Sequence, residues 1–108
     1  MTPQQIKRAK RLAEILGLIT HDVHTMDGIQ LPITENGDEF NPEQDKALLW
    51  DLQMNNNVDL TTHDRKYCNI FGWDSNVKMV YKKIRVPNDK LPAALIDCVI
   101  EINGGYDG

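Results

Sequence analysis

Apolar positions recur at helical spacing near the start of the chain, and local signals mark both ends of the helix that they predict. The repeating positions are Ile6, Ala9, Leu12 or Ala13, and Leu16. Thr2 precedes Pro3, and Gln5 lies three residues after Thr2, which is the pattern of a capping box with proline at the first helical position. Gly17 can adopt the left-handed conformation that ends a helix. We therefore expect a helix from Pro3 to Gly17, with its basic residues largely on the face away from the apolar stripe.

Two further helices are predicted, one in the middle of the chain and one near its end. In the middle helix, Asn41 is the expected N-cap, Pro42 the first helical residue, and the asparagines at 55–57 the stop. Its apolar residues are Ala47, Leu48, Trp50, Leu52 and Met54. The last helix is expected to run from residue 89 or 91 to 103, with Pro92 in its first turn. Its apolar positions are Leu91, Leu95, Val99 and Ile102.

Between these two helices, apolar and polar positions alternate as they do in strands. The candidate strands are 58–61, 67–73 and 77–86, with a turn at 74–76. After the consecutive Lys82-Lys83 the alternation shifts by one residue, which predicts a β-bulge or a twist.

Residues 18–40 form the least regular segment. A short strand at 18–20 is one reading, and alternating apolar residues at 29–33 are another strand signal. Pro32 lacks a backbone donor, which favours an edge strand or a loop. Asn36-Gly37 predicts a turn.

The order of these elements predicts an α+β fold, with a small antiparallel sheet covered by helices in a layered sandwich. The hairpin at about 67–86 is its centre, and the strands should pair as a meander. A length of 108 residues fits one domain, in which 1–39 are an N-terminal helix and irregular extension and 40–104 are the core. The residues that we expect to be buried are Trp50, Leu52, Ile70, Leu95 and Val99.

Composition indicates a cytoplasmic protein. No stretch of about 18 apolar residues could span a membrane, and the first residues lack the apolar run of a secretory signal. Cys68 and Cys98 are far apart, and we interpret both as free, buried thiols in a reducing cytosol.

Charge is unevenly distributed, although the net charge is only −4. Residues 1–11 carry four bases and no acid, residues 12–64 carry eleven acids and one base, and residues 65–90 carry seven bases and two acids. These segments either neutralise one another in the fold or form an acidic and a basic side suited to a charged partner.

Candidate chemistry is sparse. His21 and His24 have the spacing of two ligands on one helix face, but the segment is not convincingly helical and the other donors (His63, Cys68 and Cys98) show no paired spacing. Cys68 follows His63 by five residues yet lies in a predicted strand, so we expect packing rather than catalysis. Arg65 and Lys66, in the polar loop 61–66, could bind an anion, although most such loops bind nothing. We therefore expect no enzyme activity, no metal and no cofactor.

From Phe40 onward the sequence is similar to a known family. Phe40-Asn41-Pro42 with Asp45 opens a helix, a hairpin follows, and the closing helix carries Leu-Pro-Ala-Ala-Leu-Ile-Asp-Cys-Val-Ile at 91–100. This resembles small bacteriophage-encoded proteins with the phage ABA sandwich domain, over about residues 40–104. The resemblance implies a layered α/β/α sandwich expressed in an infected bacterium, and it supplies no catalytic or binding residues.

The leading functional expectation is a phage accessory protein that binds another protein, such as a component of the host or of its defences. The expected partner-binding residues belong to the acidic segment: Glu35, Asp38, Glu39 and Glu43. The alternative is a small nucleic-acid-binding regulator that uses the basic first helix and the basic hairpin. A helix-turn-helix is disfavoured, because residues 18–33 show no helical period.

Overall fold

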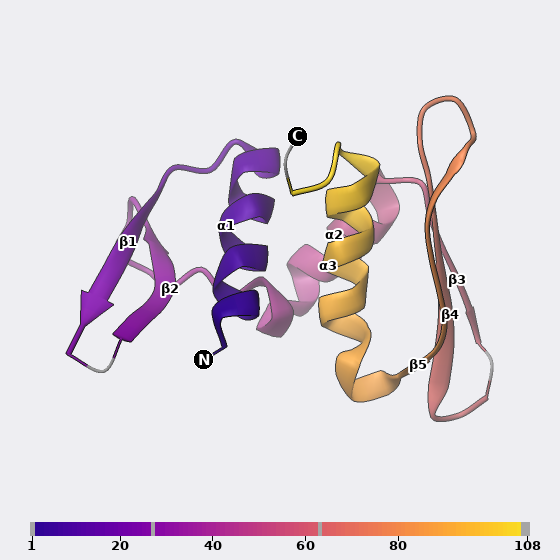
Figure 1. Cartoon of the computed structure of the whole chain (residues 1–108), viewed down its shortest axis with the longest axis horizontal. Coiled ribbons are helices and arrows are strands. Elements are labelled where there is room, and N and C mark those ends of the chain that lie inside the picture. The colour runs from indigo at the N-terminus through magenta and orange to yellow at the C-terminus, as the bar shows by residue number, and fades with distance from the viewer. Residues whose placement is uncertain (1, 27, 63, 107–108) are drawn as a thin grey trace. The chain divides into compact units, whose positions relative to one another are not determined.

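The chain forms two compact units, Met1–Pro42 and Glu43–Gly108. The computed structural model describes residues 2–26, 28–62 and 64–106. Over these residues it has three α-helices and two antiparallel sheets (Figure 1). The predicted α+β class is confirmed, and the single domain expected over 1–108 stays a prediction. No helix in the described part of the chain has the length and apolar character needed to cross a membrane.

The first unit begins with helix α1 (Pro3–Leu16). The Thr2 hydroxyl accepts the amide of Gln5 at 3.2 Å, and the Gln5 side chain accepts the amide of Thr2 at 2.9 Å. Gly17 ends the helix with a φ of 72°. The predicted capping box and helix end are therefore confirmed. Arg8 is buried, contrary to the expectation for the basic residues, because it lies one turn before Leu12 at the margin of the apolar stripe.

The segment expected to be irregular forms a hairpin of β1 (Thr20–Thr25) and β2 (Gly28–Thr34). The register shifts so that Leu31 and Pro32 lie together opposite Asp22. Such a bulge accommodates proline, which has no backbone donor for the ladder.

The chain then turns back on β2 at the predicted Asn36-Gly37 turn. The amide of Gly37 donates to the carbonyl of Thr34 at 2.9 Å, and the amide of Thr34 donates to the carbonyl of Asp38 at 2.8 Å. Gly37 has a φ of 85°, the left-handed conformation that a three-residue hairpin loop requires. The returning residues pair with β2 through the amide of Phe40, which donates to the carbonyl of Pro32 at 2.8 Å.

The second unit is built on a sheet of β3 (Val58–Thr62), β4 (Tyr67–Trp73) and β5 (Met79–Pro87). The strands pair in sequence order, which confirms the predicted meander and its hairpin. The predicted bulge is also confirmed, because Ile84 and Arg85 lie together opposite Asn69. The side-chain oxygen of Asn69 accepts the amide of Arg85 at 2.9 Å and so closes the gap in the ladder.

Helix α2 (Lys46–Asn55) starts later than predicted. Residues 42–44 form a 3₁₀ turn instead of the first helical turn, and Asp45 is the N-cap, with its carboxylate accepting the amide of Leu48 at 3.1 Å. The expected N-cap at Asn41 is therefore wrong. Helix α3 (Leu91–Ile102) has Pro92 in its first turn, as predicted.

Helix α3 packs on one face of the β3–β5 sheet (Figure 1). The core between them contains Ile70, Val86, Ala94 and Cys98, with Val58, Leu60, Tyr81, Leu91 and Ile102 around it. Leu52, Ile70, Leu95 and Val99 are buried as predicted, whereas Trp50 is 62% exposed and that prediction is wrong. Apolar residues occur on both sides of α2, so its sequence does not reveal which side is covered.

Gly72 on β4 is where α3 comes closest to the sheet. A Cβ atom at this position would lie 2.5 Å from Sγ of Cys98 and 3.2 Å from Cβ of Tyr81. The absent side chain therefore fixes the distance between helix and sheet.

We predict that Gly72→Ala lowers the free energy of unfolding by about 1–3 kcal/mol, because it overpacks this contact. Cys98→Ala removes the nearest atom, so the double variant should be less destabilised than the sum of the two single variants. Urea unfolding of the four proteins measures this coupling. Strictly additive losses would contradict the described packing.

Candidate binding surfaces

Helix α2 presents an apolar stripe to solvent. Ala47, Trp50 and Met54 follow one another at helical spacing, and Trp50 and Met54 are 62% and 65% exposed. We call these three residues the α2 stripe. A monomeric surface rarely holds a tryptophan and a methionine together in this way, and such patches mark interaction sites.

A groove of about 280 Å³ adjoins the stripe. Its walls come from α2, β3 and the start of α3, and its lining is mostly apolar: Leu49, Trp50, Leu60, Leu91, Pro92 and Leu95. The Trp50 side chain belongs to both features. Stripe and groove together form a surface into which an apolar side chain of a partner fits.

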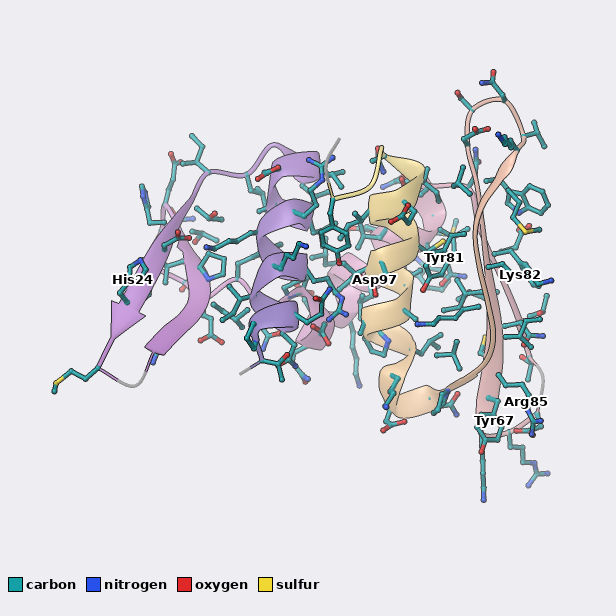
Figure 2. All side chains as sticks on the ribbon, viewed as in Figure 1. His24, Tyr67, Tyr81, Lys82, Arg85 and Asp97 are labelled. Atoms are coloured by element: carbon teal, nitrogen blue, oxygen red, sulfur yellow. The ribbon has the colours of Figure 1, made fainter. Side chains whose placement is uncertain are left out.

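The second surface is the face of the β3–β5 sheet that turns away from α3, which we call the open face. Side chains alternate along β4, so Ile70 and Gly72 point to α3 while Tyr67, Asn69, Phe71 and Trp73 belong to the open face. Lys82 and Arg85 of β5 lie on this side in Figure 2, whereas Tyr81 points toward α3.

Each aromatic residue of the open face has a polar or charged neighbour. The Arg85 guanidinium carbon lies 5.5 Å from the centre of the Tyr67 ring. Phe71 pairs directly with Lys82 across the strands, which brings their Cβ atoms to about 5 Å. The indole N–H of Trp73 donates to the carboxylate of Asp59 at 2.9 Å.

A hollow of about 520 Å³ lies at the Trp73 end of the open face. It is lined by Asn56, Asn57, Val58, Asp59, Trp73, Asp74 and Val77. The Asn56 side chain is held by two bonds, because it donates to the Leu52 carbonyl at 2.9 Å and accepts from Asn103 at 3.3 Å. The hollow therefore combines an aromatic wall with ordered amide groups.

The hairpin tip beside this hollow is strained. The amide of Val77 donates to the carbonyl of Asp74 at 3.0 Å, and that of Asp74 donates to the carbonyl of Lys78 at 2.9 Å, which is the bonding pattern found around Gly37. Val77 takes the left-handed position with a φ of 60° and is 78% exposed. A β-branched residue rarely adopts this conformation.

The acidic residues expected to bind a partner fall in both units. Glu35, Asp38 and Glu39 are brought together by the turn after β2, and all three are exposed. Glu43 belongs to the 3₁₀ turn before α2 and to the second unit. Their role in binding stays a prediction.

The candidate metal and anion residues are dispersed. His21 and His24 lie in β1 rather than in a loop, and three positions along a strand place them on opposite faces. No three His, Cys, Asp or Glu side chains of the described residues gather as metal ligands. His63 lies outside the described residues. Arg65 and Lys66 are exposed next to Asp64, whose carboxylate accepts the amide of Lys66 at 2.7 Å.

The two thiols differ in their surroundings. Cys98 is fully buried, and burial, with a smaller effect of the Asp97 carboxylate, raises the pKa of its thiol to about 12. Cys68 is half-buried rather than buried, and its Sγ lies 3.3 Å from the carbonyl oxygen of Thr61.

Comparisons with protein-family models, with curated proteins and with solved structures find no match for this chain. The resemblance to the phage ABA sandwich domain over about residues 40–104 therefore stays a prediction.

Both surfaces contain residues that sequence reasoning did not select. Trp50 is among the residues predicted to be buried, and the alternation at 67–73 predicts a strand without assigning a role to its aromatic residues. One signal was available, because Gly72 marks the side of β4 that a helix can approach closely and leaves Tyr67, Phe71 and Trp73 on the other side.

We predict that Val77→Gly raises the free energy of unfolding by about 0.5–1 kcal/mol, since glycine relieves left-handed strain and an exposed side chain gives up little packing. Thermal or urea unfolding measures the change. Gly37→Val, the reverse exchange in the other hairpin, should lower stability. Equal stability of Val77→Gly and the wild type would show that the tip is relaxed.

We predict that Cys98 is protected from alkylation in the native protein, because a thiol with a pKa of about 12 is almost entirely protonated at pH 8. The measurement is the rate of iodoacetamide labelling in a Cys68→Ser variant, with and without denaturant. Labelling of the native variant at the denatured rate would contradict the burial of Cys98.

Proposed function

We propose that this chain is a non-enzymatic protein-binding module, and that its working surface is the α2 stripe with the adjoining groove. The observation that carries the proposal is the 62% exposure of Trp50 beside an apolar groove. Tryptophan is among the residues that contribute most at protein interfaces, because it buries a large rigid area when a partner covers it.

Charge around the stripe defines the partner. Glu43, Asp45 and Asp51 flank it, and Lys46 is the one base in residues 43–55. A partner segment with an apolar stripe and basic flanks complements this surface, and an amphipathic helix has that form. The acidic turn with Glu35, Asp38 and Glu39, in the first unit, is proposed as a further contact for basic residues of the partner.

The biological context of this proposal rests on the resemblance of residues 40–104 to the phage ABA sandwich domain. We propose that the module is an accessory protein of a bacteriophage that acts in the cytoplasm of an infected bacterium. Its target in this proposal is a protein of the host or of the host's defences.

The test uses Trp50 as its own reporter. The chain has two tryptophans, so Trp73→Phe leaves Trp50 as the single tryptophan, which is excited selectively at about 295 nm. We predict that a model amphipathic peptide of leucine and lysine shifts the Trp50 emission to the blue, whereas a leucine and glutamate peptide of the same pattern does not. By calorimetry, Trp50→Ala should weaken binding about thirtyfold, a loss of about 2 kcal/mol.

Two further variants separate apolar contact from charge. Asp38→Lys with Glu39→Lys should slow association at low salt and flatten its salt dependence. Met54→Ala should act mainly on dissociation. Equal affinity of Trp50→Ala and the Trp73→Phe protein for the leucine and lysine peptide would overturn the proposal.

A further inference from the structure

We propose that the open face of the β3–β5 sheet binds single-stranded nucleic acid, a second activity on a surface separate from the α2 stripe. The face combines aromatic rings along β4 with basic side chains along β5. Because the two proposals rest on different residues, either one can fail without the other.

The aromatic residues are placed for stacking. Tyr67, Phe71 and Trp73 share one side of a single strand, and six residues of strand separate the first from the last by about 20 Å. All three are partly exposed and none lies under α3. Bases of an extended strand stack on such rings irrespective of sequence, whereas paired bases in a duplex cannot reach them.

The basic residues supply the complementary charge. Residues 58–87 carry six bases and three acids, in a chain whose net charge is −4. Lys82 and Arg85 stand beside two of the rings. Within the described part of the chain, none of these six bases is in an ion pair, and two of them, Lys82 and Arg85, lie on the open face, where phosphates can reach them.

The three acids of this segment are engaged locally. Asp64 and Asp74 accept backbone amides of the two turns at the ends of the strands, at 2.7 Å from Lys66 and 2.8 Å from Asn76. Asp59 accepts the indole N–H of Trp73 at 2.9 Å and so fixes the plane of that ring. Asp59 lies opposite Phe71 on the β3 side of the open face and Lys82 lies opposite it on the β5 side, so the basic part of the face runs along β5.

The hollow beside Trp73 extends the surface. Its volume of about 520 Å³ and its amide side chains, Asn56 and Asn57, offer room and hydrogen-bonding groups for one unstacked base. The strained tip at Val77 forms part of its wall.

Three bases of the first helix are paired or buried. Lys10 pairs with Asp22 at 3.0 Å, Arg11 pairs with Glu14 at 2.9 Å, and Arg8 is buried. The sequence predicts two basic segments for nucleic-acid binding, the first helix and the hairpin. The present proposal rests on the hairpin alone.

The experiment follows Trp73 in a Trp50→Phe protein while an oligo(dT) of about eight nucleotides is added at low salt. We expect quenching of Trp73 and amide shift changes confined to β4, β5 and the hollow. Phe71→Leu keeps an apolar side chain but removes the ring, and it should weaken binding at least fivefold. Lys82→Gln with Arg85→Gln should lower the slope of log affinity against log salt by about 1.4, as the loss of two phosphate contacts requires.

The matched control is Lys46→Gln with Lys90→Gln, which removes the same charge from exposed positions outside the open face and should leave the slope unchanged. Circular dichroism and unfolding curves check that each variant folds. Duplex DNA and heparin should bind more weakly than oligo(dT). Absence of oligo(dT) binding, equal binding of heparin, binding unchanged in Phe71→Leu, or preference for an acidic peptide would each overturn the proposal.

Discussion

The second unit depends on the close approach of α3 to β4 at Gly72. Because no side chain stands there, Cys98 can fill the space above the sheet and the helix can seal that face. The same contact decides which residues remain in water: once Ile70 and Gly72 face the helix, the alternation of the strand turns Tyr67, Phe71 and Trp73 to the other side. The contact at Gly72 therefore determines both the packing of the core and the composition of the open face.

Two surfaces of opposite character result. The α2 stripe is apolar with acidic flanks, and the open face is aromatic with basic residues. Within the second unit, the acids of residues 43–51 and the bases of residues 65–85 thus belong to different elements. The two proposed sites therefore lie on different elements of the second unit, one suited to a basic protein segment and the other to an anionic strand.

The features that could be predicted from the sequence are those that depend on short runs of neighbouring residues. The capping box at Thr2, the turn at Gly37 and the phase shift after Lys83 each depend on a few neighbouring residues, and the structure contains all three. Trp50 could not be placed in this way, since α2 has apolar residues on both sides and only its packing decides between them. The start of α2 was missed because Asn41 and Asp45 are both good caps, and a 3₁₀ turn separates them. The open face could not be predicted from the sequence alone, because its residues depend on which side of β4 is covered by α3.

The bulge at Arg85 has a consequence for how the sheet ends. β5 is an outer strand, and an outer strand with free backbone groups invites a second molecule to add a strand of its own. Here Lys82 and Lys83 are exposed on the outer strand, and the bulge at Ile84 and Arg85, closed toward β4 by the Asn69 side chain, makes the strand irregular. Charged side chains and a bulge of this kind disfavour the pairing of a further strand along β5.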